Sequence, residues 1–153
     1  MRSLELRIPP VLVAIIIGVA MWAVSVVTPK LPVGDTARLL GAIAVGALGV
    51  AAALAGVAEF RRVQTTVDPT NPGNSTSVVT SGIYRFTRNP MYLGFLLVVV
   101  GWAVYLSNPW GFIGPIVFVL YMNRFQIEPE ERILAARFGA PFEQYLRSVR
   151  RWI

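Results

Sequence analysis

The sequence predicts an all-α, polytopic membrane protein with about four transmembrane helices and a C-terminal amphipathic helix. Hydrophobic residues make up 55% of the 153 residues and charged residues only 14%, whereas charged residues are about 25% of an ordinary soluble domain. The charges gather in the gaps between four apolar runs. A chain of this length is expected to form one domain, 1–153, with two membrane helices in residues 1–60 and a functional core in residues 61–153.

Residues 11–27 form an uninterrupted apolar run that predicts the first membrane helix. Pro9 and Pro10 precede it, and proline suits the first turn of a helix, where a missing N–H group costs little. Arg2 and Arg7 before the run are also typical of a signal peptide, but the apolar part of a signal peptide is about 7–15 residues long. The longer run favours a retained helix.

Residues 39–57 predict a second membrane helix, which is rich in glycine and alanine. Its small residues Gly41, Gly46, Gly49 and Ala52 leave room for a neighbouring helix to approach closely. We therefore expect another helix to pack directly against this face.

Two shorter apolar runs, residues 91–106 and 110–122, follow a polar stretch. Each is below the ~20 residues of a perpendicular span, and the Ser-Asn-Pro sequence at 107–109 predicts a tight turn between them. They form either a hairpin that crosses the bilayer or a re-entrant pair buried in protein. The hairpin is favoured, because the second helix can gain length by continuing through residues 123–124.

The distribution of basic residues predicts the orientation in the membrane. With four spans, one side holds only Lys30 and Arg38, and the other holds all remaining basic residues: Arg2, Arg7, Arg61, Arg62, Arg85, Arg88 and every arginine from Arg124 onward. Lys and Arg accumulate on the cytoplasmic side of membrane proteins. Both termini and the loop before residue 90 are therefore expected in the cytoplasm.

Two polar segments complete the expected organisation. Residues 63–77 are rich in turn-forming residues and form either a flexible cytoplasmic loop or a lid over a binding site. Residues 141–152 place apolar side chains on one helical face beside several arginines, which predicts an amphipathic helix lying on the inner leaflet or packed over a site.

The chain contains no Cys and no His. This excludes disulfides, thiol nucleophiles, Cys/His metal sites and an imidazole base, so no metal site is expected. The net charge of +6 is explained by membrane topology and anionic lipid rather than by nucleic acid. Nothing in the sequence indicates the oligomeric state.

The segment at 80–94, Thr-Ser-Gly-Ile-Tyr-Arg-Phe-Thr-Arg-Asn-Pro-Met-Tyr-Leu-Gly, is the most informative part of the chain. Together with the Glu-Pro-Glu-Glu sequence at 128–131, Phe138-Gly139 and residues 145–152, it closely resembles the isoprenylcysteine carboxyl methyltransferase and phospholipid methyltransferase superfamily. The resemblance covers roughly residues 60–153 and implies a small integral membrane enzyme of the bacterial type. Its expected location is the inner membrane of a prokaryote.

The resemblance implies that S-adenosylmethionine is the methyl donor. Positions that bind this cofactor in relatives correspond to Thr76, Ser77, Val78, Val79, Tyr84, Asn89, Pro90, Met91, Tyr92 and Glu130. The predicted catalytic residues are Glu130, Arg88 and Asn89, although the isoprenylcysteine enzymes have His at the position of Asn89. From chemistry alone, the same residues also suit a helix cap, inside-positive arginines and an interfacial belt of tyrosines.

The acidic cluster Glu128, Glu130 and Glu131 has two interpretations. Pro129 and the carboxylates suit the first turn of a solvated helix that runs to Phe138, with Gly139 as its C-cap. The resemblance instead implies that Glu130 contacts the cofactor, and Glu131 is then available to pair with Arg88 or Arg124.

The resemblance also predicts the residues that bind the acceptor, a lipid or another hydrophobic small molecule. The isoprenylcysteine enzymes use an Arg four residues before the cofactor-binding Glu, whereas this chain has Gln126 there and Arg124 two residues earlier. Because Gln126 cannot neutralise a carboxylate, a neutral or amine acceptor is favoured over a prenylated cysteine.

Two other functions are compatible with the sequence. A membrane reductase of the sterol-reductase type shares a related helical core and uses NADPH, and a non-enzymatic four-helix membrane protein binds neither cofactor. The cofactor that shifts the melting temperature of the purified protein distinguishes the three hypotheses.

Overall fold

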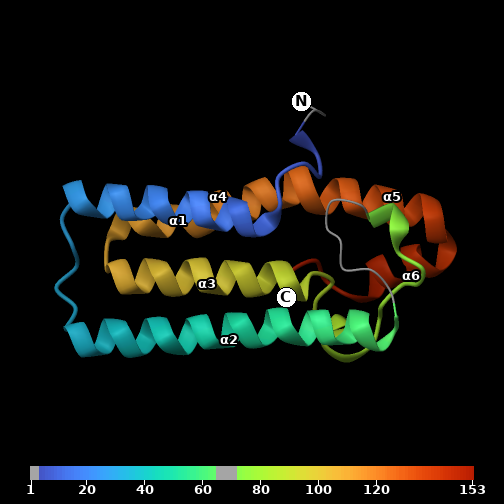
Figure 1. Cartoon of the computed structure of the whole chain (residues 1–153), viewed down its shortest axis with the longest axis horizontal. Helices are drawn as coiled ribbons and strands as arrows, with labels where there is room; N and C mark the ends of the chain where they lie inside the picture. The colour runs from blue at the N-terminus through green and yellow to red at the C-terminus, as the bar shows by residue number, and fades with distance from the viewer. Residues whose placement is uncertain (1–3, 65–71) are drawn as a thin grey trace.

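The computed structural model describes residues 4–64 and 72–153. Within these ranges the protein is helical, and Figure 1 shows α1 (Pro10–Val27), α2 (Asp35–Arg62), α3 (Pro90–Leu106) and α4 (Ile113–Tyr121) lying along one long axis. The α1–α2 and α3–α4 connections lie at one end of this bundle. At the other end lie α5 (Glu128–Phe138), α6 (Ala140–Ser148) and the C-terminus.

Helices α1 and α2 are long and apolar enough to cross a membrane. Their most apolar stretches have mean hydropathies of 2.6 and 2.2, and only 22% and 11% of those stretches are buried. The core helix of a water-soluble protein buries most of its apolar residues, so this exposure favours contact with lipid. In the described part of the chain no other helix passes the same test, and α3, with 17 residues, is shorter.

Helices α2 and α3 approach closely through small residues, as the sequence predicts. A methyl group added to Gly49 would lie 2.6 Å from the Gly94 carbonyl oxygen, and one added to Gly101 would lie 3.0 Å from the Ala42 carbonyl oxygen. Any side chain at these positions would force the backbones apart. Of the residues expected at this contact, Gly46 and Gly49 meet α3 backbone and Gly41 meets Val104, while Ala53 rather than Ala52 meets Gly94.

The turn between α3 and α4 is the one that the sequence predicts. Ser107 ends α3 in the left-handed conformation, with φ 49° and ψ 44°, and the Asn108 side chain accepts a hydrogen bond from the Trp110 backbone N–H. A short 3₁₀ turn, η4 (Pro109–Phe112), then leads into α4. The apolar segment expected to start as a helix at residue 110 therefore becomes α-helical only at Ile113.

Helix α4 does not end where its apolar run ends. The chain continues through a π-helical segment, η5 (Met122–Ile127), directly into α5, and the residues at both junctions keep helical backbone angles. The predicted extension through residues 123–124 is confirmed. The predicted helix with Pro129 in its first turn and its end at Phe138 is confirmed. Its start is not free, however, because α5 follows an unbroken helical backbone with no exposed N-terminus.

The remaining elements surround this end of the bundle. Two 3₁₀ turns, η2 (Pro72–Asn74) and η3 (Gly82–Arg85), belong to the connection between α2 and α3, and Arg137 of α5 donates a hydrogen bond to the Gly73 carbonyl oxygen. Gly139 caps α5 with φ 59°, as expected. The C-terminal helix predicted for 141–152 ends at Ser148, since Val149 is extended. Of the predicted loop at 63–77, residues 65–71 lie outside the described residues.

Candidate active site

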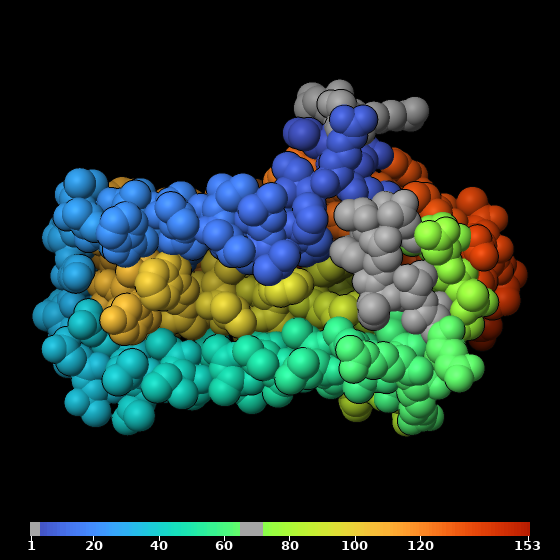
Figure 2. All heavy atoms as spheres, in the orientation of Figure 1, coloured from blue at the N-terminus to red at the C-terminus, as the bar shows by residue number. Residues whose placement is uncertain are grey.

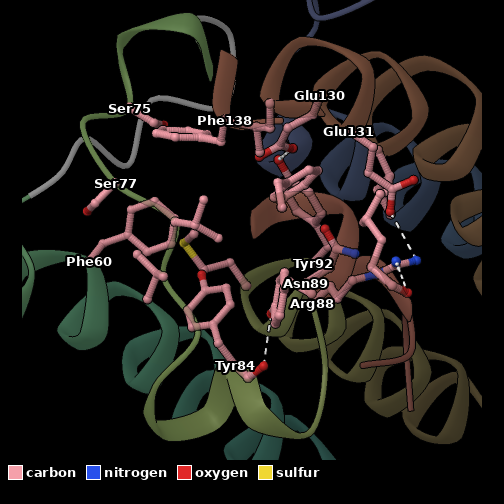
Figure 3. Close-up of a pocket in the computed structure, with 18 residues that line it drawn as sticks. Phe60, Ser75, Ser77, Tyr84, Arg88, Asn89, Tyr92, Glu130, Glu131 and Phe138 are labelled. Atoms are coloured by element: carbon pink, nitrogen blue, oxygen red, sulfur yellow. Dashed lines mark hydrogen bonds and ion pairs between the residues drawn. The ribbon is translucent and has the colours of Figure 1, made fainter. Parts of the chain in front are cut away.

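A cavity lies at the polar end of the bundle. Figure 3 shows it between Phe60 at the end of α2, Ser75 and Ser77, the η3 residue Tyr84, the start of α3, and Glu130 and Phe138 of α5. Helix α6 completes the wall with Phe142, Tyr145 and Leu146. The cavity therefore joins segments that are far apart in the sequence.

The Asn-Pro pair positions the start of α3 at the edge of this cavity. Asn89 has non-helical angles, φ −130° and ψ 57°, and Pro90 occupies the first turn, because the residue before a proline is pushed out of the helical region. The Asn89 carbonyl oxygen accepts a hydrogen bond from Leu93 N–H at 2.8 Å. The first turn then directs Met91 and Tyr92 into the cavity wall.

A hydrogen-bonded chain connects Tyr92 to the acidic cluster. The Tyr92 hydroxyl donates to Glu130 Oε2 at 2.9 Å and accepts from Gln126 Nε2 at 3.3 Å. Burial of Glu130, together with the nearby charge of Glu131, raises the pKa of Glu130 to about 7, against the lowering effect of the Tyr92 hydrogen bond. Glu130 therefore changes its ionisation near neutral pH.

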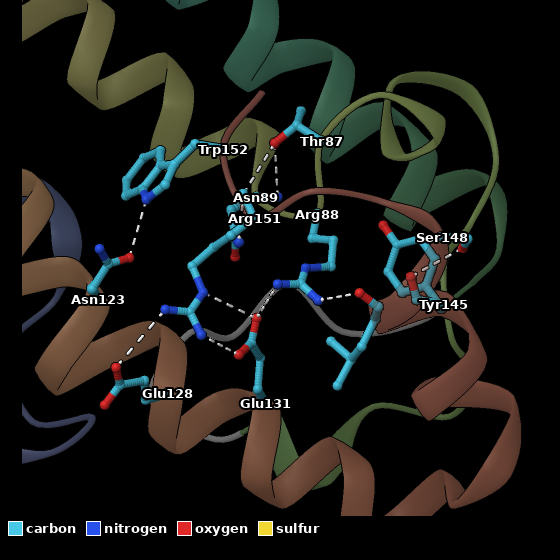
Figure 4. Close-up of polar contacts among 11 residues, drawn as sticks. Thr87, Arg88, Asn89, Asn123, Glu128, Glu131, Tyr145, Ser148, Arg151 and Trp152 are labelled. Atoms are coloured by element: carbon cyan, nitrogen blue, oxygen red, sulfur yellow. Dashed lines mark hydrogen bonds and ion pairs between the residues drawn. The ribbon is translucent and has the colours of Figure 1, made fainter.

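The neighbouring Glu131 is held by two arginines (Figure 4). Its carboxylate lies 3.2 Å from Arg88 Nη2 and 2.7 Å from Arg151 Nη2, and Arg88 Nη1 also donates to the Leu146 carbonyl oxygen at 2.9 Å. Arg88 is one of the two partners, Arg88 or Arg124, that the sequence analysis offers for Glu131. Glu131 is thereby fixed as a charged partner of the two arginines.

The last residues, 149–152, form a C-terminal strap across the motif at 87–89. Arg88 N–H donates to the Arg150 carbonyl oxygen at 3.0 Å, and the Arg151 carbonyl oxygen accepts from Asn89 Nδ2 at 3.0 Å and from Thr87 Oγ1 at 3.3 Å. At the end of the strap, Trp152 Nε1 donates to Asn123 Oδ1 at 3.0 Å. The Asn89 side chain is thus engaged with the strap in this structure.

The tyrosine side of the cavity is built from uncharged phenols. The ring of Tyr84 lies 5.4 Å from that of Phe60, and the Tyr145 hydroxyl donates to the Tyr84 carbonyl oxygen at 2.8 Å. Burial raises the pKa of Tyr84 and of Tyr145 above the ordinary value of a tyrosine. Both side chains remain neutral at physiological pH and offer flat aromatic faces.

Two polar atoms next to the cavity have no partner among the residues that the structure describes. Ser77 Oγ and Arg88 Nε are buried without a hydrogen bond, and both residues line the cavity. Buried polar groups are normally satisfied, so these two atoms are available to a ligand or a water in the cavity. The lining thus fits a ligand that combines aromatic and polar parts, as an adenosine with an amino-acid tail does.

The structure brings most of the predicted site residues together. The predicted residues that line the cavity are Ser77, Val78, Val79, Tyr84, Arg88, Asn89, Met91, Tyr92 and Glu130. Thr76 is exposed beside this group, and Pro90 is fully buried beneath it. Cofactor binding by these residues stays a prediction.

The two residues predicted to bind the acceptor lie elsewhere. Gln126 is 1% exposed and lies behind Tyr92, and Arg124 is 46% exposed and forms an ion pair with Glu5 at 3.2 Å. Neither lines the cavity. Cavity residues that the sequence does not single out include Phe60, Ile127 and Leu134. The apolar face expected for the C-terminal helix was the signal for Phe142 and Tyr145.

Comparison with known proteins agrees with the family resemblance of the motif. The profile of the phospholipid methyltransferase family matches residues 37–141. The chain is 41% identical to an uncharacterized protein of Haemophilus influenzae over 63 residues, which is 41% of this chain and 100% of that protein. No solved structure matches the chain.

Eukaryotic relatives match over a shorter share of their length. The chain is 39% identical to a probable protein-S-isoprenylcysteine O-methyltransferase of Oryza sativa subsp. indica over 75 residues, 47% of this chain and 38% of that protein. It is 36% identical to the protein-S-isoprenylcysteine O-methyltransferase of Schizosaccharomyces pombe over 75 residues, 47% of this chain and 30% of that protein. The chain therefore spans about a third of the length of these two relatives.

Proposed function

Because the chain belongs to the phospholipid methyltransferase family, we propose that it is a membrane enzyme that methylates a lipophilic acceptor. The chain is a methyltransferase by family, and its methyl donor is S-adenosylmethionine. The proposal adds the class of the acceptor, the residues of the site and the arrangement in the membrane.

The observation that carries the proposal is the composition of the cavity. It joins the motif at 77–92 to Glu130 and leaves two buried polar atoms, Ser77 Oγ and Arg88 Nε, available to a ligand. The proposed donor-binding residues are Ser77, Val78, Val79, Tyr84, Asn89, Met91, Tyr92 and Glu130, with Thr76 and Pro90 supporting them. Glu130 suits the ribose hydroxyls or the amino group, and Tyr84 suits the adenine or the sulfonium.

The chemistry asks little of the protein beyond positioning. S-adenosylmethionine supplies an electrophilic methyl group when it is bound. The walls formed by Phe60, Tyr84 and Phe142 exclude water and orient the reactants, which is the main contribution to an in-line displacement. Glu130, with a pKa of about 7, is suited to accept a proton that the acceptor gives up. The Arg88 side chain joins Glu131 to the Leu146 carbonyl oxygen, and the Arg88 backbone N–H holds the strap at Arg150.

The acceptor is proposed to be lipophilic and neutral or an amine. An apolar groove runs between α1 and α2 with α3 at its floor, which Figure 2 shows as a hollow between the two helices. Trp22, Trp102 and Phe95 are among its lining residues, and Phe95 lies one turn from Tyr92, so the groove offers a hydrocarbon tail a surface that leads to the site. Arg88 is the positively charged residue of the cavity lining, and Glu131 already neutralises it.

We propose four membrane spans with the active site on the cytoplasmic side. Helices α3 and α4 run beside α1 and α2 along the bundle, and α4 gains length from η5. The end that contains the site carries Arg61, Arg62, Arg85 and Arg88 together with the arginines of α5, α6 and the strap, whereas the opposite end carries Lys30 and Arg38. By the inside-positive rule, we propose that both termini lie in the cytoplasm. The resemblance to small bacterial members of the superfamily supports the inner membrane of a prokaryote as the location.

Isothermal titration of the detergent-purified protein tests the donor site. S-adenosylmethionine and its demethylated product are expected to bind, and NADPH is expected not to bind. Binding of NADPH alone would contradict the proposal.

Methyl transfer identifies the acceptor class. The protein is incubated with methyl-labelled donor and either extracted membrane lipids or a farnesylated cysteine analogue. Label is expected in the lipid fraction, with poor transfer to the prenylcysteine carboxylate. Efficient turnover of the prenylcysteine would show that the acceptor class is wrong.

A further inference from the structure

Gln126 occupies an unusual position in the polypeptide backbone. It lies in the π-helical segment η5, which joins a membrane helix to the helix of the acidic cluster. A π-helical turn contains one residue more than the i→i+4 turn of an α-helix, and such turns occur frequently at functional sites. Here the wider turn directs two consecutive residues inward, because Gln126 and Ile127 are both 1% exposed.

The two inward residues have different neighbours. Ile127 lines the cavity, whereas Gln126 reaches the hydroxyl of Tyr92 from behind, at 3.3 Å. An acceptor in the cavity would meet Tyr92 and Glu130 before it met Gln126. This placement differs from the acceptor-binding role that the sequence suggests for Gln126.

The directions of the hydrogen bonds follow from the chemistry of the groups. A phenol has one proton to donate, and an ionised carboxylate can only accept. When Tyr92 donates to Glu130 Oε2, its oxygen is left to accept, and the Gln126 amide N–H₂ group supplies the donor. Donation to a phenol oxygen strengthens the bond that the phenol itself donates.

We propose that Gln126 is a positioning residue that acts through Tyr92, directing the Tyr92 hydroxyl at Glu130 so that Glu130 binds the methyl donor as a carboxylate. This inference rests on the proposed donor site. It differs from the acceptor role because Gln126 acts on the donor and requires Tyr92 to do so.

The ionisation of Glu130 is the property that Gln126 would control. Within the described residues, Glu130 interacts with the hydroxyls of Tyr92 and Tyr84 and with the carboxylate of Glu131. The charge of Glu131 is itself paired with Arg88 and Arg151. The ionised fraction of Glu130 increases as the pH rises through about 7, so donor affinity increases over the same range. Weakening the Tyr92 hydrogen bond removes stabilisation of the charged form and moves this midpoint to higher pH.

The test measures binding of S-adenosylhomocysteine to the purified protein by titration calorimetry from pH 5.5 to 9. Gln126→Met keeps the size of the side chain and removes the donor, and it is expected to move the midpoint upward by about half a unit to one unit. Tyr92→Phe is expected to move it further. The double variant Gln126→Met/Tyr92→Phe is expected to match Tyr92→Phe alone, because the proposed path from Gln126 to Glu130 runs through the Tyr92 hydroxyl.

Two controls keep the result specific. Gln144→Met makes the same change at an exposed position of α6 and is expected to leave the midpoint unchanged. If Gln126→Met does not fold, Gln126→Glu presents an acceptor to Tyr92 instead of a donor and is expected to raise the midpoint at least as much. A second readout needs no ligand: the pH range over which the stability of the free protein falls extends upward in the Gln126 variants.

The possible outcomes separate this inference from the proposed function. An unchanged midpoint in both Gln126 variants, or a double variant in which the two shifts add, would overturn the role of Gln126 while leaving the donor site intact. Failure of the unaltered protein to bind S-adenosylhomocysteine at any pH would overturn both the donor site and this inference.

Discussion

The two ends of the helical bundle each contain a buried polar cluster, and the clusters differ in whether their hydrogen bonds are complete. At the α3–α4 turn, Asn108 is 0% exposed and its amide donates to Thr28 Oγ1 at 2.7 Å and to the Pro29 carbonyl oxygen at 3.1 Å. Its side-chain oxygen accepts from Trp110 N–H. Every polar atom of this side chain has a partner, so the cluster joins the two connections without outside help.

The cluster at the opposite end is incomplete. Among the described residues Ser77 Oγ and Arg88 Nε have no partner, Glu130 has a raised pKa, and all three residues line one cavity. Both ends contain asparagine followed by proline, at 89–90 and at 108–109, so the motif alone does not distinguish them. The unsatisfied atoms that line the cavity support the proposal that this is the functional end, because buried polar groups are normally paired.

The largest expected effect is on stability and comes from the complete cluster. Asn108→Ala leaves the Trp110 N–H and the carbonyl of Pro29 without their partner, which is expected to destabilise the protein by about 3 kcal/mol. Donor affinity of the folded protein should stay within twofold, since the change is at the far end of the bundle. Unfolding in detergent and titration calorimetry measure the two quantities.

Asn74→Ala is the matched control for Asn108→Ala. Asn74 is exposed in η2, and this change is expected to alter stability by less than about 0.5 kcal/mol. A large loss of donor affinity in Asn108→Ala would mean that the two ends are coupled, and the comparison would fail.

The second effect separates affinity from stability at the incomplete end. Glu130→Gln removes a charged hydrogen-bond acceptor from the donor site, which is expected to weaken donor binding by about 1.5–3 kcal/mol, or roughly tenfold or more. The same change should stabilise the free protein at pH 8. The raised pKa of Glu130 means that the folded protein resists its ionisation, so Glu130 lowers stability as the pH rises from about 4.5 to about 7.

Glu128→Gln provides the control for Glu130→Gln. Glu128 does not line the cavity, its side chain is 45% exposed and its nearest cation, Arg151, lies 3.8 Å away. We expect little change in donor affinity. Equal losses in the two variants would mean that the acidic cluster acts as a diffuse field rather than through Glu130.

The features that could be predicted from the sequence are those that depend on neighbouring residues in the chain. The apolar runs, the proline at the start of α1 and α3, the turn at 107–109 and the C-cap Gly139 each depend on a few adjacent residues, and the structure confirms them. The glycine face of α2 was likewise visible as a pattern of small residues. The cavity residues of the motif were predicted from the family resemblance. Their chemistry alone was equally compatible with a binding site and with a helix cap.

The features that the sequence missed depend on distant contacts. The π-helical segment puts Gln126 against Tyr92, and nothing in the residues of η5 signals a wider turn. Helix α6 ends at Ser148 because the next residues bind Thr87, Arg88 and Asn89, although their side-chain pattern continues the helix. In both cases a partner from another part of the chain overrides the local preference.

A smaller effect is expected from the bridge between the strap and the motif. Glu131→Gln removes the ion pairs with Arg88 and Arg151, which are partly shielded from solvent, at an expected cost of about 1–2 kcal/mol. Trypsin is expected to cleave faster after Arg150 or Arg151, as measured by mass spectrometry, because the strap is released. Glu143→Gln, an exposed change on α6, should leave cleavage unchanged, and an intact strap in Glu131→Gln would show that its backbone hydrogen bonds suffice.

The smallest effect gives the most direct comparison between complete and incomplete bonding, since it uses one substitution at two serines. Ser77 Oγ is buried without a partner, whereas Ser25 Oγ donates to the Trp22 carbonyl oxygen at 2.7 Å. Ser77→Ala therefore removes no bond from the free protein and is expected to leave its stability equal or slightly higher. Donor affinity should fall by about 0.5–1.5 kcal/mol, a few-fold, because the ligand loses the hydroxyl.

Ser25→Ala should behave in the opposite way. It removes a completed hydrogen bond in α1, so stability is expected to fall by about 0.5–1.5 kcal/mol while donor affinity is unchanged. Thermal unfolding and calorimetry measure the stability and the donor affinity of both variants. Whether a variant loses stability or donor affinity depends on whether its serine hydroxyl bonds to the protein or to the ligand. A loss of stability in Ser77→Ala without loss of affinity would mean that this hydroxyl serves the fold, and Arg88 Nε would then be the remaining unpaired atom that marks the cavity as a binding site.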